Sequence, residues 1–269
     1  MSDVTTELHE NGVFIVTLNR PDRMNAIGGT MVDDFGAAMR RAATDSDVRV
    51  VIVTGAGRAF CAGADLGAPS PRADGAEPKK SSGSQVWDRE DGLHEFHAKW
   101  SGALYELRKP TIALVNGAAA GAGLGLALSA DFRIAGEAAL FVAAFANVAL
   151  SGDSGATYGL SRLVGRSKAL ELLMLSPRIT GAEAVELGLA REVVPNDQLM
   201  ATGLDFAARL AKGSLAIFAR MKQNLAYAET HSHRDVLDME ATGMGIAYSA
   251  AEQREAVQAF LDKREPKFS

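Results

Sequence analysis

Short apolar runs alternate along the first half of the chain with segments whose apolar residues recur at helical spacing. The apolar runs cover residues 13–18, 48–54, 111–115 and 132–135. Helical spacing lies between several of them, at residues 30–43 and 93–107. The runs predict strands, and strands that alternate with helices are typical of an α/β fold.

The pattern changes in the last third of the chain. From Gly181 onward the sequence predicts mainly helices, including residues 196–211, 215–228 and 250–263, with one brief apolar run at 190–194. We therefore divide the chain into a core of residues 1–195 and a helical region of residues 196–269. The helical region is a candidate subunit contact.

Residues 67–85 are rich in proline, glycine, serine and charge, and contain almost nothing apolar larger than alanine. Such a composition predicts a loop. The loop directly follows a small-residue motif, so it is either a lid over a pocket or a surface insertion without a role.

The composition limits the classes of molecule that we expect this protein to bind. The 269 residues are 47% hydrophobic and 23% charged, which is enough for one large core and a smaller appended element. A net charge of only -5, with no segment rich in lysine and arginine, excludes a nucleic-acid or anionic-membrane footprint. A small-molecule partner is the better expectation.

No targeting or metal signal is visible. The N-terminus lacks the features of a signal peptide and the longest apolar stretch, residues 138–150, is too short to span a bilayer, so we expect a cytoplasmic protein. The single cysteine, Cys61, excludes an internal disulfide and is more typical of packing than of a nucleophile. His94 and His97 lack the spacing of a zinc site, so we expect no metal.

The glycine- and alanine-rich residues 116–125 predict a strand, a tight turn and a helix start. Small side chains let a ligand approach the backbone, and the free amides of a first helical turn hold a negatively charged oxygen. The dinucleotide fingerprint GxGxxG fails here, because Leu126 occupies its third glycine position. The alternative is that these residues only let a helix pack closely on a sheet.

A second small-residue turn, residues 55–66, also follows an apolar strand, so two strand ends can offer two converging amides. Together with residues 19–27 and 109–117, these turns resemble the crotonase (enoyl-CoA hydratase/isomerase) superfamily, and the resemblance runs from Val13 to Phe268. It implies a spiral of ββα units, a helical C-terminal trimerisation region, and a homotrimer or a dimer of trimers. It also implies a coenzyme A thioester substrate, with no cofactor besides the coenzyme A that the substrate carries.

The resemblance assigns roles to particular positions. The backbone amides of Ala64 and Ala122 would hold the thioester oxygen while negative charge develops on it. Coenzyme A binding falls to Arg23, Ala26, Ala62, Asp65, Leu66 and Lys263. For Arg23 and Lys263 the alternative is an ordinary solvated charge.

We expect Phe145, His97 and Tyr158 to line the acyl pocket. For His97, an ordinary place on an amphipathic helix is a better explanation than a role in the acyl pocket. For Tyr158, core packing explains the residue as well as the acyl pocket does.

Hydration in this family needs two glutamates that face one water. In a gap-free reading the first falls on Gly125 and the second on Phe145, and neither residue can transfer a proton. Ordinary hydration is therefore disfavoured.

Asp153 is the remaining candidate for acid–base chemistry. It follows an apolar segment and precedes a helix expected to begin at Ser154, so an N-cap is the alternative role. The resemblance favours catalysis, because an aspartate at this place is catalytic in three branches. Epoxyphenylacetyl-CoA isomerases share the pattern around it, whereas dienoyl-CoA isomerases use further carboxylates where this chain has Gly125 and Phe145.

The third branch, 4-chlorobenzoyl-CoA dehalogenase, matches residues 153–165 closely. Its mechanism needs the aspartate as nucleophile, a tryptophan at the position of Phe145 and a histidine base at the position of Ala98, and His97 lies one residue away. Three hypotheses follow: an acyl-CoA isomerase with Asp153 as acid and base, which leads; an aryl-CoA dehalogenase with Asp153 as nucleophile; and a non-catalytic acyl-CoA binding protein.

Overall fold

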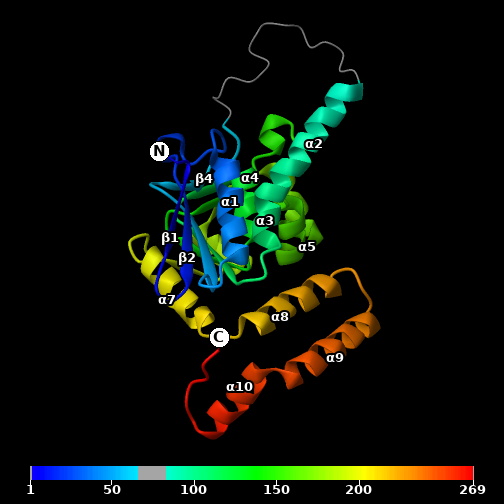
Figure 1. Ribbon diagram of the computed structural model, residues 1–269. Coiled ribbons are helices and arrows are strands. Elements are labelled where there is room, and N and C mark those ends of the chain that lie inside the picture. The colour runs from blue at the N-terminus through cyan, green and yellow to red at the C-terminus, as the bar shows by residue number, and fades with distance from the viewer. Residues whose placement is uncertain (1, 66–82, 269) are drawn as a thin grey trace, which may run out of the picture.

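The computed structural model describes residues 2–65 and 83–268, with the side chains of residues 83–89 excepted. A layered α/β body carries a helical arm (Figure 1). The large sheet has the spatial order β1 (Val4–Leu8), β2 (Val13–Leu18), β3 (Val50–Gly55), β5 (Thr111–Val115), β7 (Phe132–Gly136) and β10 (Glu192–Val194). Its neighbours are parallel, as where Val13 lies opposite Val50, except for the antiparallel pair β1–β2.

A smaller sheet contains β4 (Ala59–Cys61), β6 (Ala118–Ala120), β8 (Leu140–Val142) and β9 (Ile179–Thr180). The strands β3, β5 and β7 of the large sheet each lead into a strand of the small sheet, β4, β6 and β8 respectively, and each pair is followed by a helix. The predicted α/β fold with its spiral of ββα units is thereby confirmed.

The helices follow in chain order. They are α1 (Met31–Thr44), α2 (Gly83–Lys99), α3 (Ser101–Tyr105), α4 (Ala122–Ser129), α5 (Ala156–Leu175), α6 (Gly181–Glu186), α7 (Leu199–Ala211), α8 (Leu215–Ala228), α9 (His233–Ser249) and α10 (Ala251–Leu261). Two short 3-10 helices, η1 (Pro21–Arg23) and η2 (Ala146–Val148), lie in loops. None of the helices in the described ranges is long and apolar enough to cross a bilayer.

The central strands β2, β3, β5 and β7 of the large sheet are almost fully buried on both faces, which explains why they read as apolar runs. Val13, Ile52 and Leu114 belong to the cluster that contains Leu199 and Ala207 of α7. Side chains from alternate positions of the same strands join α1, α3, α4 and α5 in a larger cluster on the other face. The period of two along each strand therefore divides the core into two layers.

Two predicted boundaries are wrong. Residues 83–85 belong to α2 and not to a loop, because glycine and serine are tolerated in a first helical turn, whose amides need no intrahelical partner. The rest of the predicted loop, residues 67–82, lies outside the described residues. The helix expected at 93–107 is divided at Trp100 into α2 and α3, since Trp100 leaves the helical conformation with φ -102° and ψ -107°.

The last three helices form an arm that stands away from the body (Figure 1). The helix α7 packs on the large sheet, whereas α8, α9 and α10 carry exposed apolar side chains. Leu225, Tyr248 and Phe260 are 72%, 64% and 82% exposed. The division at residue 195 stays a prediction.

Candidate active site

The first small-residue turn leaves β4 and reaches Ala64. Ile27 forms an isolated parallel bridge with Ala64, in which the Ile27 amide donates to the Gly63 carbonyl at 2.7 Å and the Asp65 amide donates to the Ile27 carbonyl at 3.2 Å. In such a bridge the amide of Ala64 itself points away from Ile27. Ala64 is exposed.

The bridging loop is itself held by side chains. The buried amide group of Asn25 donates to the carbonyls of Ala56 and Ala59 at 2.9 and 2.7 Å. Arg20 donates to the Ala26 carbonyl at 2.6 Å and lies 3.3 Å from the Asp65 carboxylate. These contacts fix the turn around Ala64 without using the Ala64 amide.

The second turn leaves β6 and enters α4 through Gly121, whose φ of 55° and ψ of -122° suit glycine alone. Ala122 is the first residue of α4, so its amide has no acceptor within the helix. Among the described residues the hydrogen-bond network provides no acceptor for the amides of Ala64 and Ala122.

The two turns are in backbone contact. A Cβ on Gly63 would lie 2.7 Å from the Ala120 carbonyl oxygen and 3.6 Å from the Ala122 nitrogen. A Cβ on Gly123 would lie 2.2 Å from the Cys61 carbonyl oxygen. The glycines therefore let the two strand ends meet, and the meeting point carries two amides available to an oxyanion.

Asp153 does not cap α5. The N-cap position belongs to Gly155, α5 begins at Ala156, and the helix expected to begin at Ser154 is wrong by two residues. One carboxylate oxygen of Asp153, Oδ1, accepts from the Ser154 amide at 2.7 Å and is hydrogen-bonded to Nε2 of His97. The apolar segment before Asp153 does not make its surroundings apolar, because the histidine and the amide are polar partners.

The segment that carries Asp153 packs on the first turns of α4. A Cβ on Gly125 would lie 2.4 Å from the Ser154 carbonyl oxygen and 2.7 Å from the Ser154 Cβ. Gly125 is three residues from Ala122, so this contact places the Asp153 segment beside the amide-bearing end of α4. The absence of a side chain at position 125 is what makes room for it.

Trp100 positions the other half of the pair. Its indole, fully buried against Phe35, donates to the Ala122 carbonyl at 3.2 Å. His97 lies almost one helical turn earlier on α2. His97 and Asp153 thus approach one another from two segments that both contact the start of α4, a helix that also contacts α3, α5, β4 and β6.

Ser154 is a strained neighbour of the pair. It has φ of 52° in the left-handed region, and its buried hydroxyl has no hydrogen-bond partner among residues 2–65 and 83–268. A non-glycine residue in this conformation costs about 1 kcal/mol, and an unsatisfied buried hydroxyl costs about 1–3 kcal/mol. Both energetic costs arise in the residue that directly follows Asp153.

We expect Ser154→Gly to raise the free energy of unfolding by about 1–2 kcal/mol, because it removes both costs. Denaturant titration measures the change. Ser154→Ala separates the two causes, since it removes the hydroxyl and keeps the backbone strain, and it should recover only part of the gain. Equal stability of all three proteins would contradict this account of Ser154.

The residues assigned to coenzyme A do not all come together. Arg23, Ala26, Ala62 and Asp65 surround the first turn, and the exposed side chain of Arg23 has no ion-pair partner among the described residues. Leu66 lies outside the described residues. Lys263 follows α10 in the arm, at the opposite end of the molecule from β4 (Figure 1).

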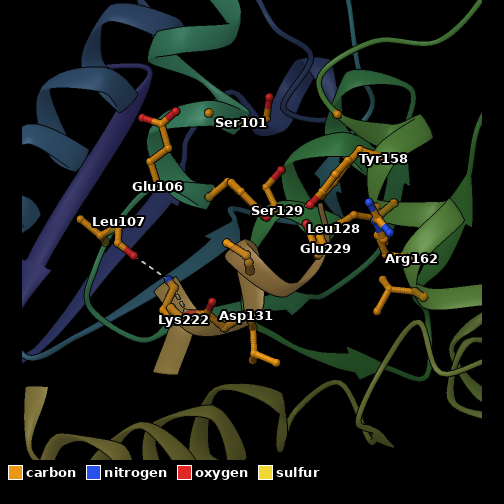
Figure 2. A pocket seen from close by; sticks show the side chains of 18 of the residues that line it. Ser101, Glu106, Leu107, Leu128, Ser129, Asp131, Tyr158, Arg162, Lys222 and Glu229 are labelled. Carbon is orange, nitrogen blue, oxygen red and sulfur yellow. Dashed lines mark hydrogen bonds and ion pairs between the residues drawn. The ribbon is translucent and has the colours of Figure 1, made fainter. Parts of the chain in front are cut away.

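A cavity of about 810 Å³ lies between the body and α8 (Figure 2). Gly155, Tyr158, Ser101 and Leu128 line it, so it begins two residues after Asp153 and four residues after His97. Phe145 and His97 do not line it: Phe145 is buried near Gly121, and His97 faces Asp153. Of the three residues expected around the acyl group, Tyr158 alone faces this cavity.

The cavity is mainly apolar, and its lining also contains charged side chains such as Lys222, Asp131 and Arg162. Figure 2 shows Lys222 reaching the Leu107 carbonyl and Asp131, at 2.5 and 2.9 Å. The Tyr158 hydroxyl lies 3.1 Å from that of Tyr105, and Arg162 covers the Tyr158 ring. Burial raises the pKa of Tyr105.

Cys61 is fully buried, and burial raises the pKa of its thiol to about 12, which fits packing and not nucleophilic attack. In the described part of the chain, no three histidine, cysteine or acidic residues are grouped to hold a metal ion.

Sequence reasoning missed several supports of this site. The roles of Trp100, Asn25 and Arg20 are not visible in the sequence, because each bonds to a group distant along the chain: Trp100 and Asn25 to backbone carbonyls, and Arg20 to the Asp65 carboxylate. The left-handed conformations of Ala144, Ala149 and Ser154 were equally invisible, since none is a residue that favours that region. A cluster of such conformations around an aspartate is a structural signal of a functional loop.

Known proteins resemble this chain over nearly its whole length. The family model for enoyl-CoA hydratase/isomerase matches residues 8–269. A Rhodobacter capsulatus protein designated "probable enoyl-CoA hydratase" is 38% identical over 258 residues, covering 96% of this chain and 95% of the relative. The 1,2-epoxyphenylacetyl-CoA isomerase of Escherichia coli K12 is 36% identical over 260 residues, covering 97% and 96%.

Among solved structures, a protein from Mycobacterium abscessus designated an enoyl-CoA hydratase/isomerase superposes with a TM-score of 0.89 at 34% identity and covers 99% of both chains. The names of the relatives include both hydration and isomerisation.

Proposed function

The chain belongs to the enoyl-CoA hydratase/isomerase family, and on that premise we propose that it isomerises an acyl-CoA thioester with Asp153 as the proton-transfer group. The observation that carries the proposal is the position of Asp153. It is free of the helix cap, paired with His97, and packed through Ser154 against Gly125 of α4.

The thioester oxygen binds between the amides of Ala64 and Ala122. Removal of a proton beside the thioester carbon puts negative charge on that oxygen, and fixed donors stabilise this charge more than the neutral substrate. Each such donor contributes roughly 3–4 kcal/mol to lowering the barrier. Both donors belong to the backbone, in turns that glycines bring into contact.

One carboxylate is sufficient for isomerisation. Asp153 takes a proton from one carbon, which leaves an enolate, and returns a proton to another carbon. Adding water requires a second group that orients the water, and the positions of the family's two glutamates hold Gly125 and the buried Phe145. This contrast favours isomerisation over hydration.

Coenzyme A would lie along Arg23, Ala26, Ala62 and Asp65, and it enters as part of the substrate and not as a separate cofactor. Lys263 follows α10 in the arm, and none of the hydrogen bonds or ion pairs of the described residues joins it to these residues, so we propose that it reaches coenzyme A from a second copy of the chain. The exposed apolar side chains of the arm, such as Leu225 and Phe260, support a homotrimer or a dimer of trimers.

The distal part of the acyl group would enter the cavity beyond Gly155. Its volume of about 810 Å³ falls in the range of small-molecule pockets, which is roughly 300–1,000 Å³. Most of the exposed lining is apolar and Tyr105 and Tyr158 contribute to it, which favours an extended or aryl acyl group.

The test is product analysis of the wild-type protein in D2O with enoyl-CoA and arylacetyl-CoA substrates. We expect an isomer that contains deuterium and no 3-hydroxyacyl product. A hydrated product would overturn the proposal in favour of hydration. Tight thioester binding without exchange or any product would instead favour a non-catalytic acyl-CoA binding protein.

The contact between His97 and Asp153 also favours a second candidate, hydrolytic dehalogenation of an aryl-CoA. Asp153 would displace halide from the ring and form an aryl ester, and His97 would activate the water that hydrolyses it. Halide release from a halobenzoyl-CoA, with an ester trapped on Asp153, would support it. The absence of halide from every halobenzoyl-CoA tested would exclude it.

A further inference from the structure

His97 lies between the Asp153 carboxylate and solvent. Its side chain is 41% exposed, whereas that of Asp153 is 28% exposed. Nε2 of the imidazole contacts Oδ1 of Asp153, and Nδ1 has no partner among the described residues. The ring therefore joins the carboxylate through one nitrogen and leaves the other nitrogen available to water.

The two oxygens of the Asp153 carboxylate also differ in their partners. Oδ1 is occupied by His97 and by the Ser154 amide, and Oδ2 has no hydrogen-bond partner in the described ranges. One oxygen is thus committed to the protein and the other is available to a substrate carbon. This division separates the atom that meets substrate from the atom that meets the histidine.

We propose that His97 is a proton relay, which exchanges the proton held by Asp153 with solvent during turnover. The proposal rests on the proposed function of Asp153. His97 acts through Asp153, and its role is to set whether the proton that returns to substrate is the one removed or one from water.

The proton balance is as follows. Asp153 breaks a substrate C–H bond and gains an O–H bond, and the electron pair stays on the enolate. While Asp153 is protonated, its carboxylic acid gives that proton to Nε2 of a neutral His97 that carries its N–H on Nδ1, and the ring becomes an imidazolium. The imidazolium loses the substrate-derived proton to water and takes up a solvent proton at Nε2 in its place. It returns this solvent proton from Nε2 to Asp153, so His97 is again neutral with its N–H on Nδ1, and reprotonation of the enolate carbon by Asp153 completes the cycle.

A purely structural histidine predicts something different. If His97 only held Asp153 in place, any side chain that donates a hydrogen bond at the same reach would preserve every feature of turnover. Glutamine is such a side chain, because its amide donates a hydrogen bond but cannot take up a proton from Asp153 and release it to water. His97→Gln therefore separates a relay from a support.

Two measurements on the full-length protein make the test. A substrate deuterated at the migrating position is turned over in H2O, and the deuterium retained in the product is measured by mass spectrometry. Separately, unlabelled substrate is incubated in D2O, and the entry of deuterium at carbon is followed. We expect His97→Gln to retain deuterium several-fold more than wild type and to take up deuterium from D2O several-fold more slowly, while isomer formation persists.

Added imidazole should restore exchange in His97→Ala, because a free imidazole can occupy the vacated space and carry the proton. His94→Gln is the matched control, since His94 lies three residues earlier on α2, is 73% exposed and does not contact Asp153. It should leave both isotope measurements unchanged.

The outcomes separate the relay from the proposed function. Unchanged retention and exchange in His97→Gln would overturn the relay while leaving isomerisation intact. If wild type forms no isomer but exchanges deuterium, isomerisation fails and the exchange rate of His97→Gln still decides the relay. If wild type shows neither an isomer nor exchange, both proposals fail.

Discussion

Replacing Gly125 with alanine is expected to lower the free energy of unfolding by about 1–3 kcal/mol and to reduce turnover about 100-fold. The new Cβ would lie 2.4 Å from the Ser154 carbonyl oxygen. That neighbour is backbone, so it cannot rotate away, and the segment carrying Asp153 must shift. A shift of about 1 Å at a reacting group is sufficient for a loss of this size.

Denaturant titration and steady-state kinetics measure the two effects of Gly125→Ala. Gly245→Ala is the matched control, since Gly245 is also helical and a Cβ there meets nothing within 4 Å. The control should be as stable as wild type, or more stable by up to about 1 kcal/mol. Wild-type stability and activity in Gly125→Ala would show that the contact with Ser154 does not constrain Asp153.

Gly125→Glu extends the same argument. It restores a glutamate at the position where the family's hydratases have their first one, yet we expect no gain of hydration, because the Ser154 backbone fills that space. A hydrated product from this variant would show that the segment around Asp153 can move aside.

Asp153→Asn is expected to lower the rate of proton transfer by about 100- to 10,000-fold. The amide has nearly the shape of the carboxylate, and its oxygen can still accept from the Ser154 amide, so the fold and the binding of an unreactive acyl-CoA should be preserved. What it loses is the ability to take a proton from carbon.

Deuterium entry into substrate in D2O measures this loss, and the dissociation constant of an unreactive thioester measures binding. Asp205→Asn, on the exposed surface of α7, is the control carboxylate and should exchange at the wild-type rate. Equal exchange by Asp153→Asn and wild type would refute the role of Asp153.

The fold could be predicted in large part because its strongest signals are local. The strands around Val50 and Thr111 are buried on both faces and therefore read as continuous apolar runs. The break at Trp100 could not be predicted, because it depends on an indole that bonds to the carbonyl of Ala122 across the core.

The site was predictable only as segments. The two turns were visible through their small residues, but that Gly63 meets Ala120 and Gly123 meets Cys61 is a tertiary fact. Asp153 was identified as a candidate carboxylate, whereas its partner His97 is 56 residues earlier and was assigned to an acyl pocket. Side-chain pairings between distant segments leave no periodic trace in a sequence.

The contact between Gly125 and Ser154 has a consequence for how such a protein diverges. In the function proposed above, the groups that hold negative charge are peptide amides, which survive almost any change of side chain. The groups that would move protons are side chains at positions 125 and 153, which compete for one volume. A glutamate on α4 and an aspartate before α5 are therefore alternatives in this molecule. The turns whose amides would bind the thioester oxygen can stay the same while the acidic side chain that moves the proton changes. A change of reaction then requires substitutions at both of these positions and no change in how the thioester is activated.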